Sequence, residues 1–249
     1  MKHIILLVLI LLFSFAYSRT VEDIDGNVYN TVRIGRQVWT VENWRSTKYA
    51  DGTPIPHVID GHEWRGLSTP AYCFIDNTTN ADSIALFGAL YNWWVVDPAN
   101  PKNIAPEGWR VPTDEDWTVL EKFLIAKRNK WYGTNEGNKI GKALSSDGGE
   151  WWDAFKTGRV GNDQDSNNSS GFSALPGGYR GIYGGFFGVG GNGYWWSATE
   201  SGGTTGTDRR ESPIRFIARN RSLDYFVESL NSYYSNRGSG LSVRLIRGN

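Results

Sequence analysis

Residues 28–34 alternate between two faces, with Val28, Asn30, Val32 and Ile34 on one face and Tyr29, Thr31 and Arg33 on the other. A two-residue period is typical of a strand with one buried face. Further strands are expected at 21–24 and 37–41, because Asp-Gly and Gly-Arg between them form short turns that tolerate positive φ. The first part of the chain is therefore predicted to be a β-meander.

Two later segments carry apolar residues at helical spacing, one over about 81–96 and one after Pro112. In the second, Thr113 is a good N-cap, and the acidic run 114–116 lies at the positive end of the helix dipole. The segment 139–144 could form a shorter helix.

From residue 151 the chain is rich in Gly, Asn and Ser, with a polar loop at 161–170 and strands expected at 194–199, 214–218 and 241–246. No internal repeat or long linker divides the chain. Two main helices, short antiparallel strands and long Gly-rich loops predict a single α+β domain over 19–249.

The first eighteen residues have the pattern of a signal peptide. Lys2 precedes the apolar run 4–15, and Ala16-Tyr17-Ser18 supplies small residues for cleavage after Ser18. An uncleaved anchor is the alternative, but the run is shorter than the roughly 20 residues that span a bilayer. We expect a protein that is secreted or held at the cell surface, with no membrane span after cleavage.

Charge and cysteine content narrow the classes of function. Lys and Arg number 26, as do Asp and Glu, and this balance argues against nucleic acid as a partner. The single cysteine, Cys73, cannot form a disulfide within the chain. Stability must come from packing, for which 12 Trp, 12 Tyr and 11 Phe supply large apolar areas.

Six blocks together resemble the Fibrobacter succinogenes major paralogous domain, in the order found in that family. They are DIDGNVYNTVRIGRQVWTVENWRSTKYADGTPIP (23–56), ALYNWW (89–94), PEGWRVPTDEDWTVLEKFL (106–124), GFSALPGGYR (171–180), GYWWSATE (193–200) and GLSVRLIR (240–247). The resemblance implies an exported bacterial domain with no established activity.

Two blocks, RVPTDEDW (110–117) and GLSVRLIR, are also similar to the formylglycine-generating enzyme superfamily. That similarity implies a C-type-lectin-like fold. It does not imply the chemistry, because those enzymes hold copper with a pair of cysteines and this chain has one cysteine. Many members of the paralogous family have cysteines where this chain has Ala105 and Leu245. If those cysteines pair, Ala105 and Leu245 are expected within disulfide-like Cα range.

Candidate metal ligands are few. His57 and His62 lie in a loop flanked by proline and glycine, which does not indicate a transition-metal site. Asp163, Asp165 and Asn167 alternate as oxygen donors and are a weak calcium candidate, although the EF-hand pattern fails. The alternative is a solvated loop, and no other cofactor is expected.

Catalytic patterns are equally sparse. Cys73 lies in an apolar stretch, where a buried hydrophobe is the commoner role than a nucleophile. Glu150 and Glu200 each adjoin a Trp-rich segment and could form a glycosidase pair, or simply mark exposed strand ends.

Aromatic residues give the best indication of function. Adjacent tryptophans such as Trp195-Trp196 should face opposite sides of a strand, so one could fill the core and the other form a stacking platform. Core packing of both is the alternative. The candidate ligand-binding residues are Tyr179, Arg180, Tyr183, Phe187, Trp195, Trp196 and Glu200.

The first hypothesis is a non-catalytic binding or surface module that recognises an extracellular glycan or a surface protein. A glycan-active enzyme on the same fold and a structural protein of the cell envelope without a small ligand are the alternatives. The sequence does not predict the oligomeric state.

Overall fold

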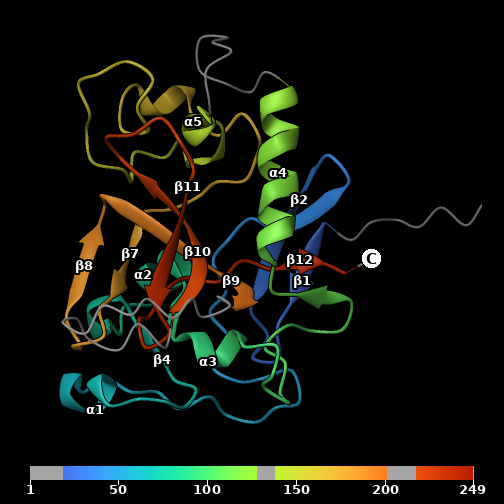
Figure 1. Ribbon diagram of the computed structural model, residues 1–249, viewed down its shortest axis with the longest axis vertical. Coiled ribbons are helices and arrows are strands. Elements are labelled where there is room, and N and C mark those ends of the chain that lie inside the picture. Colours follow the sequence, from blue (N-terminus) through green and yellow to red (C-terminus); the bar gives the residue numbers. More distant parts are fainter. Residues whose placement is uncertain (1–18, 128–137, 201–216, 249) are drawn as a thin grey trace, which may run out of the picture.

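The predicted β-meander is present at the start of the described chain. The computed structural model describes residues 19–127, 138–200 and 217–248 (Figure 1), so the predicted signal peptide lies outside the described residues. Strands β1 (Thr20–Glu22), β2 (Val28–Ile34) and β3 (Gln37–Thr40) pair antiparallel. Strand β12 (Ile246–Arg247) joins β3 to β6 (Trp109–Arg110), so the first and last strands share one sheet.

A second five-stranded sheet is formed by the C-terminal half of the described chain, in the order β11-β10-β9-β7-β8. Its strands are β7 (Gly177–Arg180), β8 (Phe186–Val189), β9 (Asn192–Glu200), β10 (Ile217–Asp224) and β11 (Asn231–Asn236). Neighbouring strands run antiparallel except β7 and β9, which are parallel. The strand predicted at 194–199 is confirmed, whereas residues 214–216 lie outside the described residues.

The strand predicted at 241–246 is wrong over most of its length. Only β12 at its end pairs regularly, and isolated bridges join Leu241 to Tyr91 and Ser242 to Trp195. These bridges tie the segment to the second sheet and to β5 (Ala89–Tyr91) at the same time. A segment whose neighbouring residues pair with strands of two different sheets cannot form a continuous series of β-bridges with either sheet.

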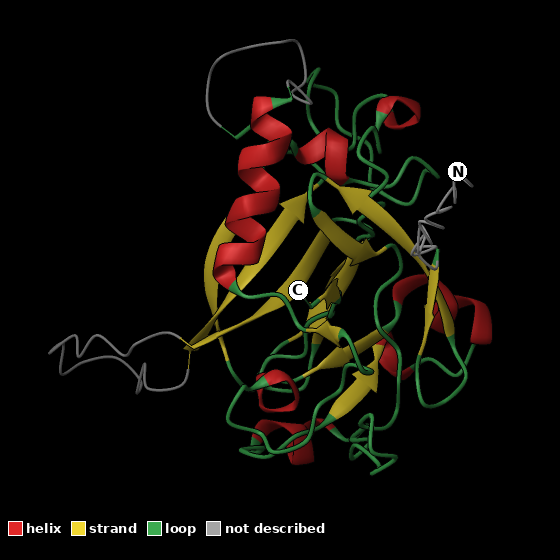
Figure 2. Ribbon diagram, turned by 90° about the vertical axis from the view of Figure 1, so that its right-hand side faces the viewer, coloured by secondary structure: helices red, strands yellow, loops and turns green. Residues whose placement is uncertain are grey.

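Helix α4 (Asp114–Ala126) confirms the prediction made from its N-cap. The Thr113 side chain accepts from the Asp116 N–H, and the Asp116 carboxylate accepts from the Thr113 N–H, which completes a capping box. Figure 2 shows α4 lying along the strands, where it packs against β9 and β10. A shorter helix, α5 (Gly141–Leu144), forms within the segment 139–144.

The single helix predicted over 81–96 is wrong. The segment forms α2 (Ala81–Phe87), then β5, then α3 (Trp93–Val96), and β5 pairs with β4 (Tyr72–Phe74). Gly88 ends α2 at φ 73°, and a Cβ there would lie 2.6 Å from the Cβ of Asn43. Gly88 and Asn43 are far apart in the sequence, so the spacing of apolar residues within 81–96 could not predict that the helix ends at Gly88. Among the described residues, the remaining helical elements are α1 (Gly61–Arg65) and the 3-10 turns Ile75–Asn77 and Gln164–Ser166.

The described residues therefore form a mixed helix-and-sheet structure in which strands predominate. No helix among them is both long enough and apolar enough to cross a membrane. Cys73 is buried, and burial raises the pKa of its thiol to about 12, which keeps the sulfur protonated. Ala105 and Leu245 are buried in the same apolar cluster, and their predicted Cα separation stays a prediction.

A buried arginine joins the two sheets. Arg244 is 0% exposed and donates to the carbonyls of Thr40, Phe172 and Ser173, and its Nε donates to Asn43 Oδ1 at 2.8 Å. Burial lowers its pKa to about 9, so the guanidinium remains charged at neutral pH. Asn43 Oδ1 also accepts from Trp195 Nε1 at 2.9 Å. The guanidinium thus donates hydrogen bonds to neutral oxygens from several segments, while the charge of Glu42 also favours its charged form.

We predict that Arg244→Met lowers the free energy of unfolding by at least about 3 kcal/mol, because three buried carbonyls lose their donor at about 1–3 kcal/mol each. Urea titration measures the change. Arg36→Met, at an exposed position in the turn after β2, is the matched control. Equal stability of the two variants would contradict the role given to Arg244.

A second prediction concerns acid stability. Burial would raise the pKa of Asp116, but hydrogen bonds from Arg110 and Thr113 outweigh burial and lower the pKa below its ordinary 3.8. The unfolded chain therefore binds the proton more readily, and this stabilisation is lost as pH falls from about 5 through the lowered pKa. Asp116→Asn should flatten the fall in unfolding free energy over that range. Glu115→Gln, at the exposed neighbouring carboxylate, should leave the slope near that of the wild type.

Candidate functional site

Trp195 and Trp196 do not form a surface platform, and that prediction is wrong. They are 1% and 0% exposed and belong to different apolar clusters. They do face opposite sides of β9 as expected. However, both sides of the strand are covered by other parts of the chain at these two residues. The Trp196 indole donates to the Tyr91 carbonyl, as the Trp195 indole does to Asn43.

Arg180 is also buried, at 1% exposed, so its predicted role as a ligand-binding residue is wrong. Its guanidinium donates to the carbonyls of Val58, Ile59 and Gly184. The same group lies over the ring of Trp64 at 4.4 Å from the centroid. Arg180 therefore fixes the hairpin of β7 and β8 against the segment before α1.

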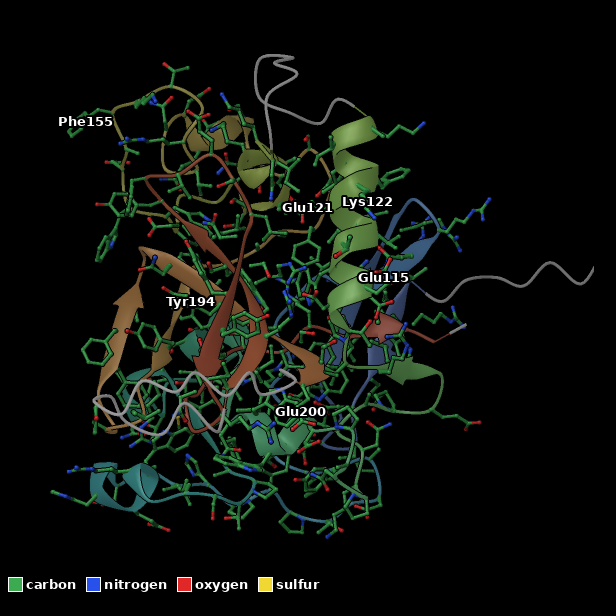
Figure 3. The ribbon with its side chains drawn as sticks, viewed as in Figure 1. Glu115, Glu121, Lys122, Phe155, Tyr194 and Glu200 are labelled. Carbon is green, nitrogen blue, oxygen red and sulfur yellow. The ribbon has the colours of Figure 1, made fainter. Side chains whose placement is uncertain are left out.

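Glu200 and Tyr183 are both exposed, but they lie on different elements. Glu200 forms an ion pair with Arg237, and Figure 3 places it in the lower part of the molecule near α3. Helix α5 and the loop after it, which carries Glu150, lie at the opposite end (Figure 1), so the two carboxylates do not form a glycosidase pair. Tyr183 is 70% exposed at the tip of the β7–β8 hairpin, with Arg65 of α1 over its ring.

The calcium candidates are not gathered around a common point. Asp163 and Asp165 are exposed, whereas Asn167 is buried and donates to the carbonyls of Ser146 and Val160. The buried Lys142 ammonium donates to the carbonyls of Asn162 and Asp163. A cation supplied by the chain thus already takes up backbone oxygens of this loop. Within the described ranges no group of three His, Cys, Asp or Glu residues could hold a metal ion.

Tyr179 and Phe187, in contrast, are brought together on one face of the second sheet. They are paired across β7 and β8, with ring centroids 5.5 Å apart. On the other side of Tyr179 lies Tyr194 of β9, at 5.1 Å and 72° between the ring planes. Three rings from three neighbouring strands therefore form a continuous row. Figure 3 labels Tyr194, which lies well away from Glu200.

The position of this row follows from the alternation of side chains along the strands and from two glycines that leave room for the Phe187 ring. Tyr194 faces away from Trp195, and Tyr179 faces away from Arg180, because successive side chains on a strand point to opposite sides. The Phe187 ring lies against the turn between the strands, where a Cβ at Gly181 or Gly185 would come within 3.2 Å of it. Side chains at those two positions would displace the ring, which is 54% exposed.

Polar groups continue the face beyond Tyr194. Ser222 of β10 lies opposite Tyr194, and Asp224 lies opposite Asn192, which donates to its carboxylate at 2.6 Å. On β11, Tyr233 is 55% exposed on the same side as Ser222, because it pairs with Asn220, two residues along the strand. We define the aromatic face by these residues: Tyr179, Phe187, Asn192, Tyr194, Ser222, Asp224 and Tyr233.

The electrostatics of the aromatic face are those of a weakly charged surface. Burial, together with the neighbouring Tyr179 and Asp224, raises the pKa of Tyr194 to about 12, so its hydroxyl stays protonated. Burial also raises the pKa of Asp224, although hydrogen bonds from Phe226 N–H and Asn192 act in the opposite direction. The face offers flat apolar rings beside hydroxyl, amide and carboxyl groups, and this arrangement suits binding of a polar ring-shaped ligand.

Sequence reasoning found Tyr179 and Phe187 but missed Asn192, Tyr194, Asp224 and Tyr233. The signal was present in GYWWSATE, because a strand that buries Trp196 on one side must bring Tyr194 to that same side. The two-residue alternation of the strand does not reveal at which residue the elements that bury Trp196 stop covering this side of β9. Tyr233 and its neighbour Tyr234 share a segment that was not predicted as a strand.

Other exposed aromatics lie beyond the ends of β9 and β10. Trp152 is 54% exposed and rests on Gly190 and Gly191, and Tyr225 meets it edge-on at 5.5 Å. Its neighbour Trp151 is buried, so this pair divides between core and surface as expected. Phe155 is fully exposed and points outward from its loop, far from the aromatic face (Figure 3).

Comparison with known proteins supports the resemblance seen in the sequence blocks. A family model described as the Fibrobacter succinogenes major domain matches residues 32–247. No curated protein and no solved structure matches the chain.

Proposed function

We propose that this chain, which belongs to the Fibrobacter succinogenes major domain family, is an exported, non-catalytic module that binds carbohydrate through the aromatic face. The observation that carries the proposal is the row formed by Phe187, Tyr179 and Tyr194, with polar groups directly beside it. A sugar ring presents C–H groups on its faces and hydroxyls around its edge. It can therefore stack on a tyrosine while its hydroxyls bond to neighbouring amides and carboxyls.

A glycan fits this surface better than a protein does. Protein partners usually need about 800 Å² per side, with an apolar centre. Here the apolar part of the face is limited to the row of three rings and the separate ring of Tyr233, and the polar Ser222, Asp224 and Asn192 lie beside them. A binding partner made of repeated small rings with hydroxyl edges matches that alternation.

Two further parts of the proposal concern export and fold. The signal-peptide pattern in residues 1–18 supports delivery to the outside of the cell, where polysaccharides are available. We propose the C-type-lectin-like fold because the first and last strands lie in one sheet and long loops connect the other elements. The similarity of RVPTDEDW and GLSVRLIR to the formylglycine-generating enzyme superfamily supports the same fold.

Binding is proposed to need neither hydrolysis nor calcium. Glu200 is engaged by Arg237 and lies at the other end of the molecule from the loop that carries Glu150. The oxygens of the 161–170 loop are partly occupied by the Lys142 ammonium. A glycan that binds equally in EDTA and is recovered intact would fit the proposal, whereas its hydrolysis would favour the enzyme alternative.

We predict that Tyr194→Ala weakens binding to polysaccharides retained by the wild type by at least about tenfold, or about 1.4 kcal/mol. The reason is that Tyr194 lies at the centre of the face, between the ring of Tyr179 on one side and Ser222 on the other. Affinity electrophoresis against a panel of plant, algal and bacterial polysaccharides measures the effect. Phe187→Ala, at a more exposed ring, should weaken binding as well and is less able to disturb packing.

Tyr234→Ala is the matched control, because Tyr234 is 49% exposed but points to the other side of β11 from Tyr233. It should bind like the wild type. If Tyr234→Ala and Phe187→Ala weaken binding equally, the ligand does not use the aromatic face. If no polysaccharide binds the wild type, the carbohydrate proposal fails and a protein partner or a structural role takes its place.

A further inference from the structure

We infer that the aromatic face binds a neutral, linear glycan that runs across the strands from Phe187 to Tyr233. This inference rests on the proposed carbohydrate-binding function and adds the length, direction and charge of the ligand. Three observations carry it: the extent of the face, its division into two halves, and the single charged side chain among its residues.

The extent of the face excludes a single sugar as the full ligand. Phe187 lies on β8 and Tyr233 on β11, at the two edges of the second sheet. Four strand intervals separate these strands, which amounts to roughly 19 Å at the usual spacing of about 4.8 Å. A single sugar ring can cover one aromatic side chain, whereas this distance requires several linked rings. The outermost rings are both more than half exposed, so each edge is open to the ligand.

The face has two halves with different chemistry, which gives a bound chain a direction. On one side of Tyr194 the rings of Tyr179 and Phe187 continue without a break. On the other side the small Ser222, which is itself buried, lies between Tyr194 and the strand of Tyr233, so the row of rings is interrupted there. We expect sugars to stack flat over the first half and to present their hydroxyl edges to the polar groups of the second half.

Polar groups flank Ser222 along the strand direction. The Asn192–Asp224 pair lies two residues along the strands from Ser222, and Asn220 lies two residues away in the other direction. Asn220 is 0% exposed, and its amide donates to Ser235. Hydroxyls on the edge of a sugar above Ser222 would meet the Asp224 carboxyl, which fixes the register of the chain.

Charge selects against acidic glycans. Asp224 is the only charged side chain among the residues that define the aromatic face. A uronate or sulfate group bound beside it would bring two like charges together in a partly buried setting, where repulsion is stronger than in water. A neutral chain of hydroxylated rings meets no such penalty.

The test is isothermal titration calorimetry with length series of linear oligosaccharides. Neutral gluco-, xylo- and manno-oligosaccharides, from the monosaccharide to the hexasaccharide, are compared with oligogalacturonides of equal length. For the neutral series that binds best, we expect affinity to rise by at least about tenfold between the disaccharide and the tetrasaccharide and then to level off. Oligogalacturonides should bind at least about tenfold more weakly, and Asp224→Asn should reduce that difference.

Tyr233→Ala tests the direction of the chain. It should remove the gain in affinity between short and long oligosaccharides, with Tyr234→Ala as the control. A gain that survives Tyr233→Ala would overturn the path across the strands. A monosaccharide that binds as tightly as the hexasaccharide, with loss on Tyr194→Ala, would overturn the linear ligand but leave carbohydrate binding intact. Preference for oligogalacturonides would overturn the neutral ligand, and failure of every series and polysaccharide to bind would overturn both proposals.

Discussion

The hydrogen bonds around Asn43 and Arg244 are the constraint on which the rest of the structure depends. Asn43 Oδ1 accepts from both Arg244 and Trp195, while its amide group donates to the Phe87 carbonyl. One side chain thus connects the segment after β3, the C-terminal segment, the second sheet and the end of α2. A guanidinium buried without a carboxylate partner is tolerated only where its donors are satisfied, so these segments must hold their relative positions.

This constraint separates the aromatic residues into two groups with different roles. Trp64, Trp93 and Trp196 are buried, and each indole N–H donates to a backbone carbonyl. They are therefore committed to the core, where they provide the packing that the chain needs without a disulfide. The tyrosines and the phenylalanine of the aromatic face lie on strands fixed by that core. Phe187 and Tyr233 are more than half exposed, whereas Tyr179 and Tyr194 are partly buried and pack against the core. A rigid support for exposed rings is what a stacking surface requires, because little conformational freedom is lost on binding.

Local patterns in the sequence were enough for the elements that depend on local physics. The meander over 21–41 follows from alternation and turn residues, and α4 follows from the capping box at Thr113 and Asp116. The predictions that proved wrong concern elements whose ends or burial depend on residues distant in the sequence. Gly88 ends a helix because Asn43 approaches it closely, and Trp196 is buried because Tyr91 and the apolar cluster around it cover that side of β9.

The candidate site was predicted in part for the same reason. Tyr179 and Phe187 were found from their composition and their place in a Gly-rich hairpin, whereas Tyr194 and Tyr233 required the pairing of β9, β10 and β11. Arg180 has the residue type expected of a sugar-binding side chain, yet three carbonyls occupy it. Residue type alone does not distinguish a ligand-binding arginine from one that holds a hairpin in place.

The decisive experiment is a crystal structure of the protein with a neutral hexasaccharide from the series that binds best. We expect sugar rings stacked on Tyr179 and Tyr194, and a sugar hydroxyl within hydrogen-bonding distance of Asp224. A glycan bound around Trp152 and Phe226, with the aromatic face empty, would contradict this expectation.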